Sequence, residues 1–150
     1  MDKEYSEINN FLVHIFNEIL RTEEASLKSK ELKNLSIREA HIIETVCDAE
    51  EIENNTASEI ALSQRITAGT LTATISNLER KGYVIRCRDQ RDKRVVRIFP
   101  TQKGKTANGV HQSFHQKMVS SIISALKEDE LQIFVKGLAA VQTFLEGDQN

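Results

Sequence analysis

The sequence contains few residues that interrupt helices or favour strands. Its 150 residues include one proline and six glycines, no tryptophan, and only 5% aromatic side chains. Proline and glycine break helices and aromatic side chains favour strands, so this composition predicts a mainly helical protein and excludes an all-β sandwich. With 39% apolar and 28% charged residues, the chain has the balance of a single globular domain over residues 1–150.

Long apolar runs and closely spaced cysteines are also missing. The most apolar run, residues 137–145, includes Gln142 and Thr143 and is far shorter than the roughly 20 residues that span a bilayer. Residues 1–5 lack the basic and apolar segments of an export signal. Cys47 and Cys87 lack the CxxC spacing of a metal or redox motif. We therefore expect a cytoplasmic protein with reduced cysteines and no membrane partner.

Basic residues are concentrated in one segment, although the whole chain carries a net charge of −2. Residues 65–105 contain 11 lysines and arginines and three acidic residues, a net charge of +8, whereas the remainder of the chain carries −10. Such a division of charge within one small domain predicts a face that binds a polyanion.

The spacing of apolar residues predicts a mainly α fold with a small β-hairpin. Ser36, Thr56, Thr67 and Thr101 are the expected N-caps of four of the helices. The expected helices cover about residues 4–27, 37–50, 57–62, 68–81, 102–126 and 128–145, and the expected strands cover residues 83–87 and 94–99.

Two short helices followed by a basic hairpin form a winged helix-turn-helix, whose second helix enters the major groove of DNA. We place this module at about residues 30–100, between dimerisation helices at about 1–29 and 101–150. The apolar stripes at residues 8–20 and 134–145 would be exposed on a monomer, so we expect a two-fold homodimer.

Three motifs resemble those of the MarR family of bacterial transcriptional regulators. Residues 78–86 read LERKGYVIR, residues 89–94 read DQRDKR, and residues 101–104 read TQKG. They follow the family patterns LExKGxxxR, DxRDxR and LTxKG, and the resemblance covers essentially the whole chain. The sequence departs from these patterns at Pro100, where the family usually has leucine, and at Ala73, where many members have arginine.

Within this family, the chain is similar to the repressors of fatty-acid synthesis genes in Gram-positive cocci. The similarity lies in residues 5–9, 15–20, 77–83, 94–96 and 114–119. It implies a dimeric repressor that binds a palindromic operator in double-stranded DNA, with long-chain acyl-acyl carrier protein as its corepressor.

Polar side chains at the start of the recognition helix and in the wing are the expected DNA contacts. Hydroxyls and free backbone N–H groups at a helix N-terminus can meet phosphates and base edges. The family resemblance implies that Arg94 reaches into the minor groove and that Asp92 holds it by an ion pair. The full expected set is Arg65, Thr67, Thr70, Thr72, Asn77, Arg80, Arg88, Asp92, Lys93 and Arg94.

An acyl effector would need an apolar tunnel between the first, second and fifth helices. The same side chains are equally suited to an ordinary core. The candidates for its walls are Phe11, Ile15, Ile19, Ile43, Val46, Val110, Phe114 and Met118.

Histidines offer an alternative effector site. His111 and His115 are four residues apart on one helix, a spacing that can present two imidazoles to one Zn²⁺. His41, with Glu23 or Glu24, could complete a tetrahedron. Zinc-sensing members of the family use a similar set, which implies a zinc-responsive repressor as the alternative. We favour a packing role for the histidines and expect no cofactor otherwise.

Motifs of common enzyme classes are absent from the sequence. It has no glycine-rich phosphate loop, no GxSxG, and no Ser, His and Asp set at a recognisable spacing. We therefore expect a protein that is not an enzyme. A third possibility is an interaction module whose basic face binds an acidic protein, and an acidic carrier protein would be such a partner.

Overall fold

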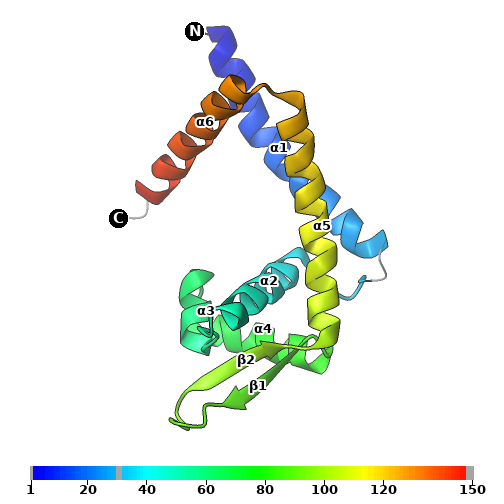
Figure 1. Ribbon diagram of the computed structural model, residues 1–150, viewed down its shortest axis with the longest axis vertical. Helices are drawn as coiled ribbons and strands as arrows, with labels where there is room; N and C mark the ends of the chain where they lie inside the picture. The colour runs from blue at the N-terminus through cyan, green and yellow to red at the C-terminus, as the bar shows by residue number, and fades with distance from the viewer. Residues whose placement is uncertain (1, 30–31, 148–150) are drawn as a thin grey trace. The chain divides into compact units, whose positions relative to one another are not determined.

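The computed structural model describes residues 2–29 and 32–147. The expected boundary of the winged helix at residue 30 and the last three residues of the second expected dimerisation segment lie outside the described residues. Figure 1 shows the elements in chain order. They are α1 (Asp2–Ser29), α2 (Ile37–Glu51), α3 (Ala57–Ser63), α4 (Ala68–Arg80), β1 (Val84–Arg88), β2 (Val96–Pro100), α5 (Gln102–Ala125) and α6 (Glu128–Gly147).

The chain divides into two compact units. The first unit, Met1–Ser113, contains α1 to β2 and the first half of α5. The second unit, Phe114–Asn150, contains the last turns of α5 and the whole of α6. The mainly helical architecture with one hairpin confirms the predicted fold class.

Side-chain caps begin the three short helices of the first unit, as the sequence predicts. The Ser36 hydroxyl accepts the Glu39 N–H, and the Glu39 carboxylate accepts the Ser36 N–H, which completes a capping box for α2. Thr56 caps α3, and Thr67 caps α4. These hydrogen bonds satisfy backbone donors that have no partner inside a helix.

The core of the first unit lies between α2, α3, α4 and the hairpin. Leu71, Ile75 and Leu78 form the buried face of α4, as their spacing predicts. Ile60 and Ala61 of α3 are buried beside them, but Leu62 is 72% exposed. Leu62 points away from the core because each successive position of a helix is rotated by about 100°. Both views show β1 beside α4 and β2 beside α2.

The strands start later than predicted. Gly82 has φ 84°, the left-handed conformation that ends α4, and the Tyr83 N–H still donates to the Leu78 carbonyl at 2.9 Å. At the second strand, the Arg94 N–H donates to the Asp92 side chain in the loop. The antiparallel ladder therefore runs from Val84 opposite Pro100 to Arg88 opposite Val96.

Two helices carry apolar side chains that nothing in their own unit covers. On α1, the exposed side chains follow the stripe that the sequence predicts, and on α6 no residue is buried. None of the described helices is long and apolar enough to cross a membrane. The exposed apolar side chains on these two helices include Ile8, Phe11, Leu12, Ile15, Phe16, Ile133, Val135, Leu138, Phe144 and Leu145.

The close contact between α5 and Tyr83, which lies between α4 and β1, gives a test of the fold. A Cβ at Gly104 would lie 2.2 Å from the Tyr83 carbonyl oxygen, whereas a Cβ at Gly109 of the same helix meets nothing within 4 Å. We expect Gly104→Ala to lower the free energy of unfolding by roughly 1–3 kcal/mol, because the backbone must shift to relieve the clash. Gly109→Ala should raise it by up to about 1 kcal/mol, because alanine favours helix.

Urea unfolding followed by circular dichroism measures both variants. Equal effects of the two substitutions would contradict the close packing of α5 on the Tyr83 carbonyl.

Candidate nucleic-acid interface

The recognition helix α4 presents small polar side chains at its start. The Thr67 hydroxyl accepts the Thr70 N–H at 3.1 Å and donates to the Thr70 hydroxyl at 2.9 Å, so the first turn is held by its own cap. Thr70, Thr72 and Ala73 are exposed. Arg65, in the turn before α4, is exposed and has φ 51°. These residues lie where the sequence predicts DNA contacts, and their contacts with DNA stay a prediction.

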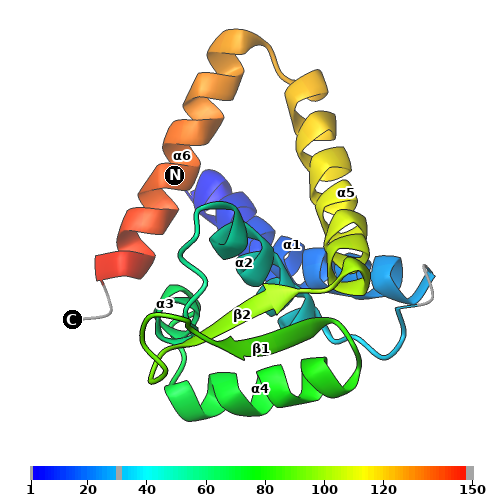
Figure 2. The same ribbon diagram turned by 60° about the horizontal axis from the view of Figure 1, so that its bottom comes forward.

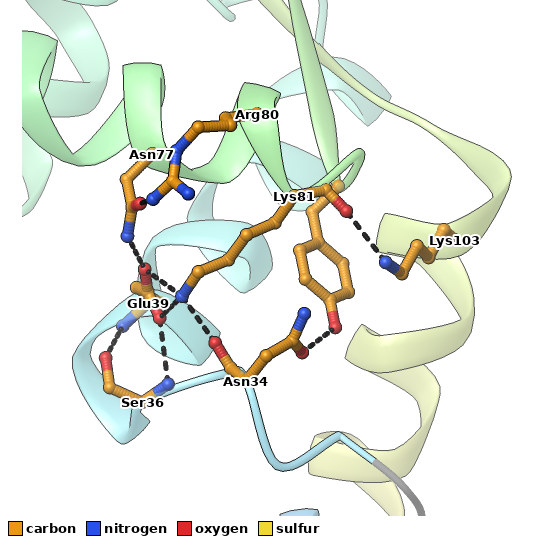
Figure 3. A network of polar contacts seen from close by, with 8 residues as sticks. Asn34, Ser36, Glu39, Asn77, Arg80, Lys81 and Lys103 are labelled. Carbon is orange, nitrogen blue, oxygen red and sulfur yellow. Dashed lines mark hydrogen bonds and ion pairs between the residues drawn. The ribbon is translucent and has the colours of Figure 1, made fainter.

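A network of polar side chains joins the far end of α4 to α2, as Figure 3 shows. The Asn77 side-chain amide donates to Glu39 Oε1 at 2.6 Å, and its oxygen accepts the Arg80 guanidinium. The structure therefore gives Asn77 two partners inside the protein, which the sequence pattern did not predict. Arg80 itself is exposed on the last turn of α4.

Lys81, the residue after α4, completes this network. Its ammonium lies 2.9 Å from both oxygens of Glu39 and also donates to the Asn34 carbonyl. The Tyr83 hydroxyl donates to the Asn34 side chain at 2.8 Å, and the Lys103 ammonium lies 4.4 Å from the centre of the Tyr83 ring. The sequence motif contains Lys81 and Tyr83, but their structural roles depend on segments more than 40 residues away.

Glu39 is the buried carboxylate of the network, with 7% of its surface exposed. Burial opposes the ionisation of this carboxyl, but hydrogen bonds from Ser36, Lys81 and Asn77 and the charge of Lys81 outweigh that effect and lower its pKa. The carboxylate therefore stays charged and acts only as a hydrogen-bond acceptor.

The tip of the wing carries an arginine held by a neighbouring acid. Arg94 Nε and Nη2 each lie 3.0 Å from an oxygen of Asp92, the geometry of a bidentate ion pair. The hydrogen bond from Arg94 lowers the pKa of Asp92. The Arg94 side chain is 92% exposed, so its guanidinium is free to approach a groove while its direction is fixed. This pair has the arrangement that the family resemblance implies.

A second acid organises the loop of the wing. Asp89 accepts the N–H groups of Arg91 and Asp92 through one oxygen and Arg97 Nε at 2.6 Å through the other. The hydrogen bond from Arg97, with those backbone donors, lowers the pKa of Asp89 to about 2. Arg88 donates to the Lys93 carbonyl across the same loop. Arg88, one of the three wing cations expected to contact DNA, is therefore also a structural part of the wing.

A third acid joins the wing to the recognition helix. Glu79 accepts the Arg86 N–H at 2.9 Å and its guanidinium at 3.1 Å, and the Ser76 hydroxyl accepts the same guanidinium. Sequence reasoning missed these three residues as parts of the site. Both Glu79 and Arg86 stand in the LExKGxxxR motif, so the motif itself carried the signal.

The predicted histidine site is partly assembled within the first unit. His111 Nε2 lies 3.0 Å from Glu23 Oε1, and His41 Nε2 lies 3.7 Å from the same oxygen. Glu23 and His111 are buried. Glu24 instead pairs with Lys28 at the surface, so the structure selects Glu23 from the two predicted acids. His115 follows His111 by one turn of α5 and belongs to the second unit.

The residues proposed to line an acyl pocket have different environments. Ile43 and Val46 are fully buried in the core, and Val110 packs against that core. Phe11 and Ile15 are exposed on α1, whereas Ile19 is half-buried. Phe114 and Met118 lie in the second unit. Two open hollows among the described residues are lined by other side chains, and the acyl pocket stays a prediction.

The capped recognition helix and the basic hairpin define the class of the protein, a winged helix-turn-helix regulator. The sequence model of the transcriptional regulator family SarA/Rot matches residues 25–110. The chain belongs to the SarA/Rot family of transcriptional regulators and has the fold of MarR-type winged-helix proteins.

Similar proteins support this assignment. The regulator SarZ of Staphylococcus epidermidis is 33% identical over 73 residues, which are 49% of this chain and 48% of SarZ, so the match spans about half the length of that curated relative. Streptococcus pneumoniae FabT, solved in complex with DNA, is 37% identical with a TM-score of 0.87, covering 97% of this chain and 99% of FabT. A structure of a MarR family transcription regulator is 14% identical with a TM-score of 0.77, covering 97% of this chain and 92% of that chain, and shows the shared fold. These relatives are transcriptional regulators, the class that the sequence predicts, and not enzymes.

Proposed function

We propose that the chain is a homodimeric repressor that binds a palindromic operator in double-stranded DNA. The observation that carries the proposal is the wing, in which Asp92 fixes the direction of the almost fully exposed Arg94. A guanidinium on a projecting hairpin fits the narrow, strongly negative minor groove of A·T-rich DNA. The capped start of α4 offers threonine hydroxyls to the adjacent major groove.

The exposed apolar side chains of α1 and α6 support the dimer. Monomeric proteins rarely expose contiguous apolar stripes of this kind, and two-fold pairing is the commonest way to cover them. A two-fold dimer would place its recognition helices on two half-sites about 34 Å apart, which matches an inverted repeat.

The genes that the protein controls are proposed to be those of fatty-acid synthesis, with long-chain acyl-acyl carrier protein as corepressor. The similarity to the fatty-acid subgroup of the MarR family and the 37% identity to FabT support this proposal.

The buried contact of Glu23 with His111 favours a second candidate, a zinc-responsive repressor. Tetrahedral zinc ligands lie about 3.3 Å from one another. The Glu23 oxygen is 3.0 Å from His111 Nε2 and 3.7 Å from His41 Nε2, so these donors fit that geometry. His115, one turn further along α5, would supply the next imidazole in this proposal.

Replacement of the wing arginine tests the DNA-binding proposal. We expect Arg94→Ala to weaken binding of a fragment from the protein's own promoter by about 1–3 kcal/mol, because a groove contact is lost. Fluorescence anisotropy at matched salt measures the affinity. Arg21→Ala, an exposed arginine of α1 paired with Glu18, is the control and should bind normally. Unchanged affinity of Arg94→Ala would remove the wing from the DNA interface.

A titration of operator binding separates the two effectors. Acylated carrier protein should raise the affinity by about 1–3 kcal/mol, the usual coupling of linked sites, whereas unacylated carrier and zinc should have no effect. The zinc proposal replaces the acyl proposal if three results are found together. Zinc alone must raise the affinity, a chelator must reverse this effect, and His111→Ala or His115→Ala must abolish it. His14→Ala, an exposed histidine of α1, is the matched control. Indifference to both ligands would contradict both effector proposals.

A further inference from the structure

Asn77 lies on the recognition helix, but both ends of its side-chain amide are engaged inside the protein. We infer that Asn77 is a positioning residue: oriented by Glu39, it holds the Arg80 guanidinium in place for a phosphate of the DNA backbone. This inference rests on the proposed DNA binding. It assigns Glu39, a residue of α2, a role in the DNA-reading helix (Figure 3).

The orientation of Asn77 follows from the chemistry of its two neighbours. A carboxylate only accepts hydrogen bonds, so Glu39 requires the nitrogen of the Asn77 amide to face it. A guanidinium only donates, so Arg80 requires the amide oxygen. Rotating the amide by half a turn would set oxygen against carboxylate and nitrogen against guanidinium. Only one orientation of the Asn77 amide therefore lets it hydrogen-bond both the Glu39 carboxylate and the Arg80 guanidinium.

The Glu39 carboxylate, at one end of this series of hydrogen bonds, is held in place by several other contacts. It is buried, it accepts the Ser36 N–H at 2.9 Å as part of the capping box, and the Lys81 ammonium lies 2.9 Å from both of its oxygens. The position of the carboxylate is thus set by the start of α2 and by the residue that ends α4. The Asn77 amide, oriented by this carboxylate, in turn sets the position of the Arg80 guanidinium at the surface.

Arg80 is the exposed residue at the other end of these hydrogen bonds. It is exposed, and a free arginine side chain loses rotamer freedom when it binds a phosphate. Asn77, one turn earlier on α4, restrains the guanidinium before DNA arrives, so less freedom remains to be lost. Restraint of one such side chain corresponds to roughly a 2- to 10-fold gain in affinity.

A double-mutant cycle tests the inference on a duplex that the wild-type protein selects from a random pool. We expect Asn77→Ala to weaken binding roughly 2- to 10-fold but to have no further effect in an Arg80→Ala background. Thr72→Ala is the control for an independent position on the same helix, and its effect should be equal in both backgrounds. Arg80→Ala should also reduce the slope of affinity against salt by about one, the mark of a lost phosphate contact.

Glu39→Gln tests whether Glu39 sets the orientation of the Asn77 side-chain amide. Glutamine keeps the capping box, but its amide can donate as well as accept, so Asn77 is no longer held in one orientation. We expect Asn77→Ala to lose its effect on DNA binding in this background. Lys81→Met removes the cation but keeps the acceptor, so there the effect of Asn77→Ala should persist.

Two results would overturn the inference. Additive effects of Asn77→Ala and Arg80→Ala would show that Asn77 acts independently, and a changed preference for bases in Asn77→Ala would show that it contacts DNA directly. Rotation of the Arg80 guanidinium, measured by NMR in the protein without DNA, should be slow and should quicken in Asn77→Ala. Unchanged rotation would also overturn the inference. Failure of the wild-type protein to select any duplex would instead contradict the proposed function, and the NMR result would still decide whether Asn77 holds Arg80.

Discussion

A buried carboxylate stays charged only if a cation and hydrogen bonds replace the water that it loses. Glu39 meets this condition by joining the start of α2 to the end of α4 through Ser36, Lys81 and Asn77. Lys81 supplies the cation, whereas Ser36 and Asn77 supply neutral hydrogen-bond donors. Glu39 therefore links the start of α2 to the recognition helix α4, and through Asn77 it contacts the surface that α4 presents.

Pairs of an acidic residue with an arginine organise the basic segment, residues 65–105. Residues 65–105 contain three acidic residues, and each of them holds an arginine. Glu79 holds Arg86 between helix and wing, whereas the other two hold arginines within the wing, Asp89 at Arg97 and Asp92 at Arg94. A largely exposed pair such as Asp92 with Arg94 adds little stability, so its main effect is to fix the direction of the arginine side chain. Acidic residues in a DNA-binding face reduce its net positive charge, but they fix the directions of the arginine side chains that they hold.

Features that depend on spacing within one helix could be predicted from the sequence, whereas contacts between distant residues could not. The Ser36 cap and the buried face of α4 were correct because both follow from spacings within one helix. The partner of Asn77 was missed because Glu39 lies 38 residues away and the helix pattern treats Asn77 as outward-facing. The choice between Glu23 and Glu24 also needed the structure, since neighbours on a helix point about 100° apart and only packing decides which one faces the core.

The side-chain amide of Asn77 gives the most direct test of this account, by NMR as pH is lowered while the protein stays folded. Because the pKa of Glu39 lies below its ordinary value of 4.5, the two amide proton signals should move with a midpoint below that pH. The movement should be absent in Glu39→Gln. Amide signals that do not respond to pH in the wild type, or that respond equally in Glu39→Gln, would contradict the claim that Glu39 sets the surface of the recognition helix.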